Sequence, residues 1–110
     1  MHYEDYTPVF QALSDTTRLK IIDLLSCGEM CACEILEHLT ILQSTLSYHM
    51  KKLTDVNLVL ARKEGPWVHY RLNNEFIEEF IHFMELISHP KEECICKHKS
   101  PCTNSTACKK

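Results

Sequence analysis

The chain has 110 residues, enough for one compact domain with a single hydrophobic core. Hydrophobic residues make up 45% of it and charged residues 25%, no apolar run could span a bilayer, and a signal peptide is not recognisable at the start. We therefore expect a cytoplasmic protein with no membrane partner. The formal net charge of −3 argues against a broadly basic nucleic-acid-binding protein, so any contact with nucleic acid requires a local basic face.

Two short amphipathic helices are expected before residue 28. The apolar positions of the first are Val9, Phe10 and Leu13. It ends near Ser14 and Asp15, either of which can cap the second helix by accepting hydrogen bonds from its free amide groups. The stripe of the second helix is Leu19, Ile22 and Leu25, widened by Ile21 and Leu24. Gly28 supplies a C-terminal stop for this helix.

Two more helices follow, and the second of them has a well-defined apolar stripe. The first is predicted from about Cys31 to Leu39, with Ile35, Leu36 and Leu39 inward. After residues 40–42 comes a helix whose buried positions at i, i+4 and i+7 are Leu46, Met50 and Leu53. The other faces of this helix are polar and hold Ser44, Thr45, Ser47, Tyr48, His49, Lys51 and Lys52.

A β-hairpin and a last helix complete the predicted domain, residues 1–88. Residues 58–64 and 67–72 read as strands, and Gly65-Pro66 between them indicates a turn. The last helix is expected from about Asn74 to Ser88, and Pro90 stops it. Residues 89–110 hold no apolar periodicity and are expected to form a flexible, cysteine-rich tail.

The apolar stripe of the last helix is wider than a small domain can cover. Its members are Phe76, Ile77, Phe80, Ile81, Met84 and Ile87. We expect this helix and the first one to form a homodimer interface; the alternative is that the stripe packs wholly inside the monomer. The expected interface residues are Val9, Phe10, Phe76, Ile77, Phe80, Met84 and Ile87.

The predicted order of elements is helix, helix, helix-turn-helix, β-hairpin, helix, which is that of a mainly α winged helix-turn-helix domain. Four segments in this order, residues 10–19, 31–33, 43–49 and 65–71, resemble the ArsR/SmtB family, and the resemblance spans roughly residues 8 to 88. It implies a homodimeric bacterial transcriptional repressor that leaves its operator when a metal ion binds. The arsenic-responsive branch is the most similar.

The helix after residue 42 has the residue types of a DNA-recognition helix. Short polar side chains suit base edges, and cations suit phosphates. The candidate DNA contacts are Gln43, Ser44, Thr45, Ser47, Tyr48, His49, Lys51 and Lys52, with Arg62 and Lys63 in the wing. For any single residue the alternative is the solvated face of an amphipathic helix. A dimer presents two such helices roughly 34 Å apart, which predicts a dyad-symmetric operator.

Cys31 and Cys33 open the helix that precedes this recognition helix. Seven cysteines in a cytosolic chain indicate metal or redox chemistry, and all-sulfur ligation selects thiophilic ions. On an intact helix, side chains two residues apart point roughly 200° away from each other. Both thiolates therefore reach one ion only if the first turn distorts, and this distortion is the expected route from ion binding to DNA release. The alternative is that both are small, half-buried apolar residues.

The resemblance points to As(III) or Sb(III), each satisfied by three thiolates, as the inducer. Arsenic repressors of the resembled type often carry a third cysteine where this chain has Leu36. Water or a small thiol can complete the shell instead. Further candidate ligands are Cys27 and the tail cysteines Cys94, Cys96, Cys102 and Cys108.

Zinc sites are weaker candidates. Together with His98, the tail cysteines could bind Zn(II) or Cd(II), but their spacing matches no familiar zinc motif. Zinc-sensing relatives use an Asp-x-His-x10-His-x2-Glu pattern in the last helix. Here His89 and Glu92 match its second half, whereas Phe76 and Glu78 occupy the first, so we expect no such site.

The leading hypothesis is a metalloid-responsive repressor that binds operator DNA as a homodimer and is released by As(III) or Sb(III). The alternative within the same fold is a repressor that senses Cd(II), Pb(II) or thiol redox state with tail cysteines. A cysteine-rich metal carrier or oxidoreductase is a third reading. We do not expect an enzyme, because the sequence offers no coherent catalytic constellation.

Overall fold

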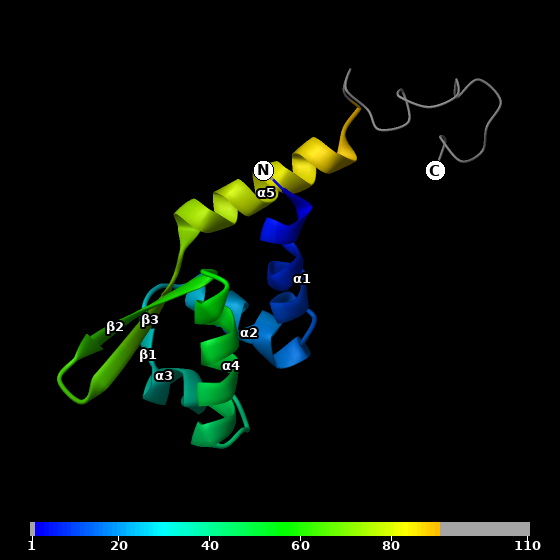
Figure 1. Cartoon of the computed structure of the whole chain (residues 1–110). Helices are drawn as coiled ribbons and strands as arrows, with labels where there is room; N and C mark the ends of the chain where they lie inside the picture. Colours follow the sequence, from blue (N-terminus) through cyan, green and yellow to red (C-terminus); the bar gives the residue numbers. More distant parts are fainter. Residues whose placement is uncertain (1, 91–110) are drawn as a thin grey trace.

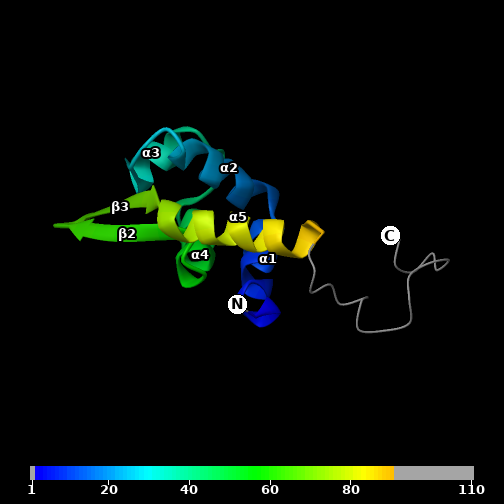
Figure 2. The same cartoon turned by 90° about the horizontal axis from the view of Figure 1, so that it is seen from above.

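The computed structural model, which describes residues 2–90, combines short helices with a small antiparallel sheet at one side of the molecule (Figure 1). In chain order the elements are η1 (Tyr3–Asp5, a 3-10 turn), α1 (Thr7–Leu13), α2 (Thr16–Leu25), β1 (Met30–Cys31), α3 (Ala32–Glu37), α4 (Gln43–Asp55), β2 (Val59–Glu64), β3 (Trp67–Leu72) and α5 (Asn74–Ser88). The hairpin β2–β3 extends to one side, and α5 crosses one end of the molecule above α1 (Figures 1 and 2). Apart from η1 and β1, this is the predicted winged helix-turn-helix order.

Helix α2 begins at an aspartate cap and turns the predicted stripe toward the core, with the exception of Leu19. The Asp15 carboxylate accepts a hydrogen bond from the backbone amide of Arg18 at 3.1 Å, as expected for an N-cap. Ile21 and Leu25 are buried, whereas Leu19, placed in the predicted stripe, is 51% exposed. The prediction for Leu19 is wrong because Arg18, its neighbour, occupies the inward side of the first turn.

Residues 30 and 31 form a short strand, β1, that is not among the predicted elements. Met30 pairs with Tyr70 and Cys31 with His69, so β1 is an edge strand of a three-stranded sheet with the order β1-β3-β2. Gly28 precedes it with a φ of +137°, a conformation that glycine adopts without steric cost. Helix α3 consequently starts at Ala32 rather than at Cys31, and it ends at Glu37, shorter than predicted.

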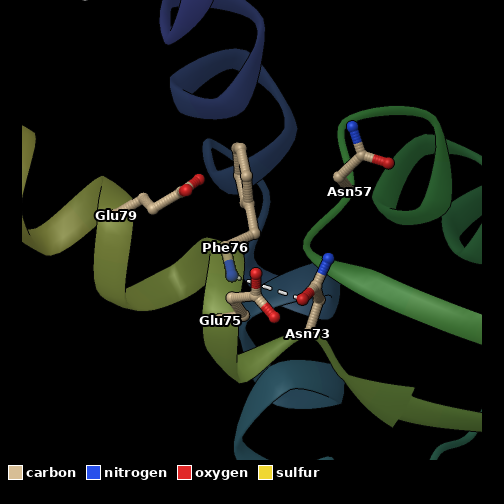
Figure 3. Close-up of a pocket in the computed structure, with 5 residues that line it drawn as sticks. All are labelled: Asn57, Asn73, Glu75, Phe76 and Glu79. Atoms are coloured by element: carbon tan, nitrogen blue, oxygen red, sulfur yellow. Dashed lines mark hydrogen bonds between the residues drawn. The ribbon is translucent and has the colours of Figure 1, made fainter.

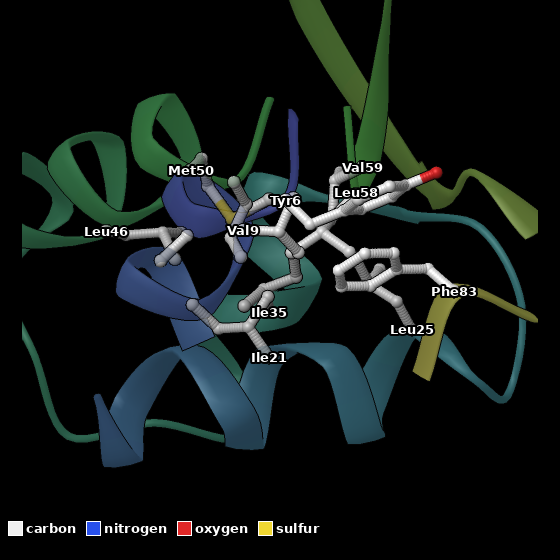
Figure 4. Close-up of a cluster of buried hydrophobic side chains, with 12 residues drawn as sticks. Tyr6, Val9, Ile21, Leu25, Ile35, Leu46, Met50, Leu58, Val59 and Phe83 are labelled. Carbon is white, nitrogen blue, oxygen red and sulfur yellow. The ribbon is translucent and has the colours of Figure 1, made fainter. Parts of the chain in front are cut away.

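Helix α4 carries the predicted stripe, which belongs to the hydrophobic core; Leu46 and Met50 are labelled in Figure 4. Leu46, Met50 and Leu53 are almost fully buried, together with Ile21 of α2 and Ile35 of α3. Helices α2 and α3 and strand β2 pack against α4. Helix α4 is therefore held in place by three other elements of the same chain.

Helix α5 has the predicted bounds, Asn74–Ser88, and Asn73 caps it. The Asn73 side chain accepts a hydrogen bond from the Phe76 amide at 3.2 Å, beside a polar cavity of about 250 Å³ that Glu75 also lines (Figure 3). Phe83 is the residue of α5 that is fully buried, stacked on Tyr6 with 4.2 Å between ring centroids. The predicted stripe omitted Phe83.

The described part of the chain, residues 2–90, holds no helix that is both long and apolar enough to cross a membrane. Predictions about the tail from residue 91 onward, including Glu92 and all four tail cysteines, fall outside the described residues.

Candidate functional site

Cys31 and Cys33 lie side by side without any distortion of α3. Cys31 is the N-cap of α3, with an extended backbone (φ −81°, ψ 164°), and its Cα lies 5.4 Å from that of Cys33. The two sulfur atoms are in contact and are paired as a disulfide. The prediction that the first helical turn must open to bring them together is wrong, because pairing of β1 with β3 keeps Cys31 out of the helix.

The surroundings of the pair differ on its two sides. Cys31 is buried and its backbone amide donates a hydrogen bond to the Glu34 carboxylate at 3.0 Å, while Cys33 is exposed. Cys27 is exposed as well, and within residues 2–90 no group of three or more histidine, cysteine or acidic side chains is arranged to hold a metal ion. Cys27 therefore does not join the pair in this conformation.

A cavity of about 390 Å³ opens beside Cys33 and connects the cysteine pair to both predicted DNA-binding elements. Its lining includes Cys33 and Leu36 of α3, Gln43 and Ser47 of α4, and Trp67 and Tyr70 of β3. Burial raises the pKa of the Tyr70 hydroxyl, which therefore stays protonated at neutral pH. The cavity thus combines an apolar wall with hydroxyl and amide groups next to a thiol.

The outer surface of α4 carries most of the candidate DNA contacts. Gln43, Ser44, Ser47, Tyr48, Lys51 and Lys52 are exposed, and Thr45 is half-buried. The ammonium of Lys52 lies 5.4 Å from the centre of the Tyr48 ring, and that of Lys51 lies 3.3 Å from the Asp55 carboxylate. Both are weak surface interactions that leave the cations free to meet phosphates.

His49 is a buried structural residue, contrary to the prediction that it lies on the exposed face. It is 8% exposed, and its Nδ1 accepts a hydrogen bond at 3.0 Å from Nη1 of Arg18, because a guanidinium can only donate. Arg18 is buried too, and its Nε donates to the Ala12 carbonyl at 2.6 Å. These bonds tie α1 and α2 to α4. The sequence signal was His49 lying at i+3 from Leu46, inside the apolar stripe.

The wing holds an ionic cluster that reaches back to the residue before β1. Arg62 donates to the Glu29 carboxylate at 2.6 Å and lies 3.5 Å from that of Glu64. His69 lies between the two carboxylates, 3.3 Å from Glu64 and 3.9 Å from Glu29. The hydrogen bond from Arg62 holds the pKa of Glu29 below its ordinary value, and the same bond raises that of Arg62. Both groups are therefore charged at neutral pH, and Lys63 is exposed beside them.

The predicted interface residues divide into two groups. Phe10, Met84 and Ile87 are exposed, as are Ile81 and Leu86. Phe76, Ile77 and Phe80 are half-buried against the core. Val9 is 1% exposed, so its assignment to an interface is wrong: it belongs to the core of the monomer, where it packs in the same cluster as Ile21 and Met50.

Three comparisons with known proteins agree with this geometry. Residues 15–60 match the family described as bacterial regulatory protein, arsR family. Over 98 residues, 89% of this chain and 94% of the relative, the chain is 44% identical to the arsenical resistance operon repressor of Staphylococcus aureus. It is 37% identical over 90 residues, 76% of this chain and 74% of the relative, to a cadmium resistance transcriptional regulatory protein CadC homolog of Staphylococcus aureus.

The fold comparison includes a solution NMR structure of a homodimeric winged helix-turn-helix DNA-binding domain from Mycobacterium bovis, a possible ArsR-family transcriptional regulator. It is 28% identical to this chain with a TM-score of 0.64, and the match covers 77% of this chain and 79% of that one. The similarity therefore covers most of the chain and is not confined to the helix-turn-helix.

Proposed function

The chain belongs to the ArsR family of bacterial regulatory proteins, and we propose that it binds a dyad-symmetric operator as a homodimer and leaves it when As(III) or Sb(III) binds Cys31 and Cys33. As a member of this family it is a DNA-binding transcriptional repressor with a winged helix-turn-helix fold, not an enzyme. The observation that carries the inducer proposal is the adjacency of the two sulfur atoms at the junction of β1 and α3.

DNA binding is assigned to the exposed faces of α4 and the wing. Gln43, Ser44 and Ser47, in the first turns of α4, are suited to base edges and backbone, with Thr45 and Tyr48 beside them. Lys51, Lys52, Arg62 and Lys63 supply the phosphate contacts. His49 is left out of this set, since its ring is committed to Arg18.

Dimerisation is assigned to α5 and the adjoining part of α1. Exposed apolar side chains, Phe10, Ile81, Met84 and Ile87, lie on these two helices at the end of the molecule opposite the first turn of α4 (Figure 1). A second copy would bury them and set two α4 helices about one turn of DNA apart, roughly 34 Å. The Staphylococcus aureus relative is named as a repressor of an operon, and the Mycobacterium bovis domain is homodimeric.

The thiol pair is connected to DNA contacts by two routes. Cys31 pairs with His69 of β3, in the wing, and α3 packs directly on α4. Reduced Cys31 and Cys33 present two sulfur ligands, and a metal ion deprotonates the thiols that coordinate it. An ion bound there shifts β1 and α3 and so favours a different arrangement of wing and α4 from the one that binds DNA. Linkage makes this antagonism reciprocal.

Operator binding of the reduced protein, followed by fluorescence anisotropy on a duplex from upstream of its own gene, tests the proposal. As(III) and Sb(III) should release the native protein, whereas Cys31→Ser and Cys33→Ser should bind DNA equally well but fail to respond. Cys27→Ser, an exposed thiol outside the pair, is the matched control and should respond normally. Release by As(III) that survives the loss of Cys31 would refute the site. Equal release by Zn(II) would refute the preference for thiophilic ions.

Thiol-redox sensing is the second candidate, and the pairing of Cys31 with Cys33 as a disulfide favours it. Oxidation would change the same β1–α3 junction without any metalloid. Under this alternative, protein oxidised at Cys31 and Cys33 binds the operator with a different affinity from reduced protein in metal-free buffer. Equal affinities for the two forms would exclude redox sensing by this pair and leave the ion as the inducer, with Cd(II) and Pb(II) as the competing ions.

A further inference from the structure

The cavity beside Cys33 is large enough for a small organic molecule and lies between the ion site and the DNA-binding surface. It measures about 390 Å³ and is bounded by α3, α4 and β3. Among the residues that line it, Leu36 and Trp67 are apolar, whereas Gln43 and Ser47 carry an amide and a hydroxyl. A molecule with a short carbon chain and a polar end fits this lining.

Two protein thiolates satisfy only part of the valence of a trivalent metalloid. As(III) forms three bonds, and Cys31 and Cys33 supply sulfur for two of them. Leu36 is three residues beyond Cys33, on the same face of α3, and lines the same cavity with no ligand atom. Within the described residues, the cavity next to Cys33 therefore contains no third sulfur from the protein.

We infer that the cavity between α3, α4 and β3 binds a small-molecule thiol whose sulfur completes a three-thiolate shell around the ion held by Cys31 and Cys33. The inference rests on the proposed function, because it names the co-ligand of that same site. The apolar wall of Leu36 and Trp67 receives the carbon chain of the thiol. Gln43, Ser47 and the Tyr70 hydroxyl receive its polar end.

The chemistry balances without any change of oxidation state. Arsenous acid, As(OH)₃, reacts with the two reduced protein thiols and one small thiol. Three As–O bonds break, three As–S bonds form, and the three thiol protons leave with the hydroxides as three molecules of water. Where Cys31 and Cys33 start as a disulfide, two further small thiols reduce them by exchange and leave as their own disulfide.

The bound thiol also gives the ion a direct effect on DNA contacts. Gln43 and Ser47 line the cavity and belong to the proposed base-contacting set on α4, and Trp67 opens the second strand of the wing. A ligand that holds these side chains lowers their availability to DNA. Release of the operator then requires the ternary complex of protein, ion and thiol.

Trp67 is the single tryptophan of the chain and reports on the cavity directly. The test uses the full-length chain with Cys27, Cys94, Cys96, Cys102 and Cys108 replaced by serine, reduced with a phosphine, which adds no thiol. As(III) is titrated against Trp67 fluorescence at several concentrations of free cysteine as the probe thiol. The affinity for As(III) should rise about tenfold for each tenfold rise in low thiol concentration, by mass action. Native mass spectrometry should show one arsenic and one thiol per protomer.

Leu36→Cys supplies a third sulfur from inside the same cavity and separates the co-ligand from the rest of the site. This variant should bind As(III) tightly with no dependence on added thiol. Leu36→Ser introduces a side chain of nearly the same size as cysteine but without the sulfur atom, so its affinity for As(III) should still depend on added thiol. Circular dichroism checks that both variants fold. A thiol dependence that persists in Leu36→Cys would overturn the inference, as would thiol-independent binding in the parent.

The remaining outcomes distinguish this inference from the proposed function. If As(III) binds and releases the operator with no effect of thiol, the proposed function stands and the co-ligand does not. Restoring Cys27 and the tail cysteines tests whether one of them supplies the third sulfur ligand. If the complete chain binds As(III) without thiol dependence, one of these cysteines supplies the third sulfur and the inference is wrong. If As(III) fails to bind Cys31 and Cys33 at all, the proposed function itself fails.

Discussion

Helices α4 and α5 are similar in length but differ in what covers their apolar faces. The stripe of α4, including Leu53, is buried entirely by other parts of the same chain. On α5, Phe83 is buried at 4% exposure, whereas Ile81 at 52% and Ile87 at 44% remain in contact with solvent. The apolar face of α4 is thus covered within its own domain, whereas that of α5 is left exposed and is available for the proposed dimer.

This difference allows the free energy of unfolding of the protomer and the free energy of association of two protomers to be changed separately by mutation. Substitutions in the stripe of α4 should change the free energy of unfolding of each protomer. Substitutions on the outer face of α5 should change the free energy of association and leave the protomer folded. Substitutions in the polar contacts of α2 and the wing should have smaller effects. Those at the cap of α2 should change the free energy of unfolding, and those in the wing should change DNA affinity. The predictions below test this division.

Leu53→Ala should produce the largest effect, on unfolding. Leu53 is 0% exposed at the centre of the core, so the substitution leaves a cavity and should cost about 2–5 kcal/mol in the free energy of unfolding. Urea denaturation measures this cost. Leu42→Ala, at a position that is 73% exposed immediately before α4, is the matched control and should change it by less than about 0.5 kcal/mol. Equal costs for both would mean that α4 is not anchored as described.

Ile81→Glu should have the next largest effect, on association. A carboxylate at the centre of the apolar face of α5 would be buried without a partner in a dimer, which should weaken dimerisation by about 100-fold or more, or roughly 2.7 kcal/mol. Sedimentation velocity measures the fraction of dimer, and urea denaturation at low protein concentration measures the stability of the protomer. His82→Glu adds the same charge to the polar face and should leave the dimer intact. A dimer that tolerates Ile81→Glu would place the interface elsewhere.

The contrast between α4 and α5 also shows how far sequence patterns reach. The stripe of α4 and the bounds of α5 follow from apolar periodicity, because buried positions on one helix repeat every three or four residues. Burial of His49 could not be predicted from that pattern alone. It depends on Arg18, 31 residues away, which supplies the donor that makes a buried imidazole affordable. For the same reason Leu19, next to Arg18, was assigned to the wrong side of α2.

The geometry of Cys31 and Cys33 required information that is not local. The residue types predict a thiol site, but helical periodicity places the two side chains on opposite faces. Pairing of Cys31 with His69, 38 residues later, holds its backbone extended and brings the sulfur atoms together. A two-residue strand leaves almost no periodic signal, so only the tertiary structure reveals it. The predicted cost of opening a helix therefore disappears from the mechanism.

Asp15→Ala should have a smaller effect that depends on pH. Asp15 caps α2, and loss of the cap should cost about 1 kcal/mol of unfolding free energy at pH 7. The hydrogen bond from the Arg18 amide holds the pKa of Asp15 below its ordinary value of 3.8 in the folded state. The stabilisation by the charged cap is therefore present above about pH 4 and is lost as the pH falls through the lowered pKa.

Urea denaturation of Asp15→Ala and of Asp15→Asn between pH 2.5 and 7 makes this test specific. Asparagine keeps the cap without a titratable group, so Asp15→Asn should retain most of the stability at pH 7. The advantage of the native protein over both variants should shrink below pH 4. An advantage that stays constant down to pH 2.5 would show that ionisation of Asp15 contributes nothing.

Glu29→Gln should give the smallest change, in DNA affinity alone. The Glu29 carboxylate accepts a hydrogen bond from Arg62 at 2.6 Å, and the lowered pKa keeps it ionised at neutral pH, so it competes with a DNA phosphate for the same guanidinium. Because the pair is exposed, we expect operator affinity to rise by only about two- to fivefold at low salt, with unfolding and association unchanged. Anisotropy titrations at several salt concentrations measure this affinity, and screening should remove the gain at high salt.

Two control variants separate competition for Arg62 from a general removal of negative charge. General removal of negative charge predicts the same gain from Glu37→Gln, on the exposed face of α3, and the same gain from Glu29→Gln in an Arg62→Ala background. Competition for Arg62 predicts no gain in that background, because the double mutant lacks the guanidinium for which carboxylate and phosphate compete.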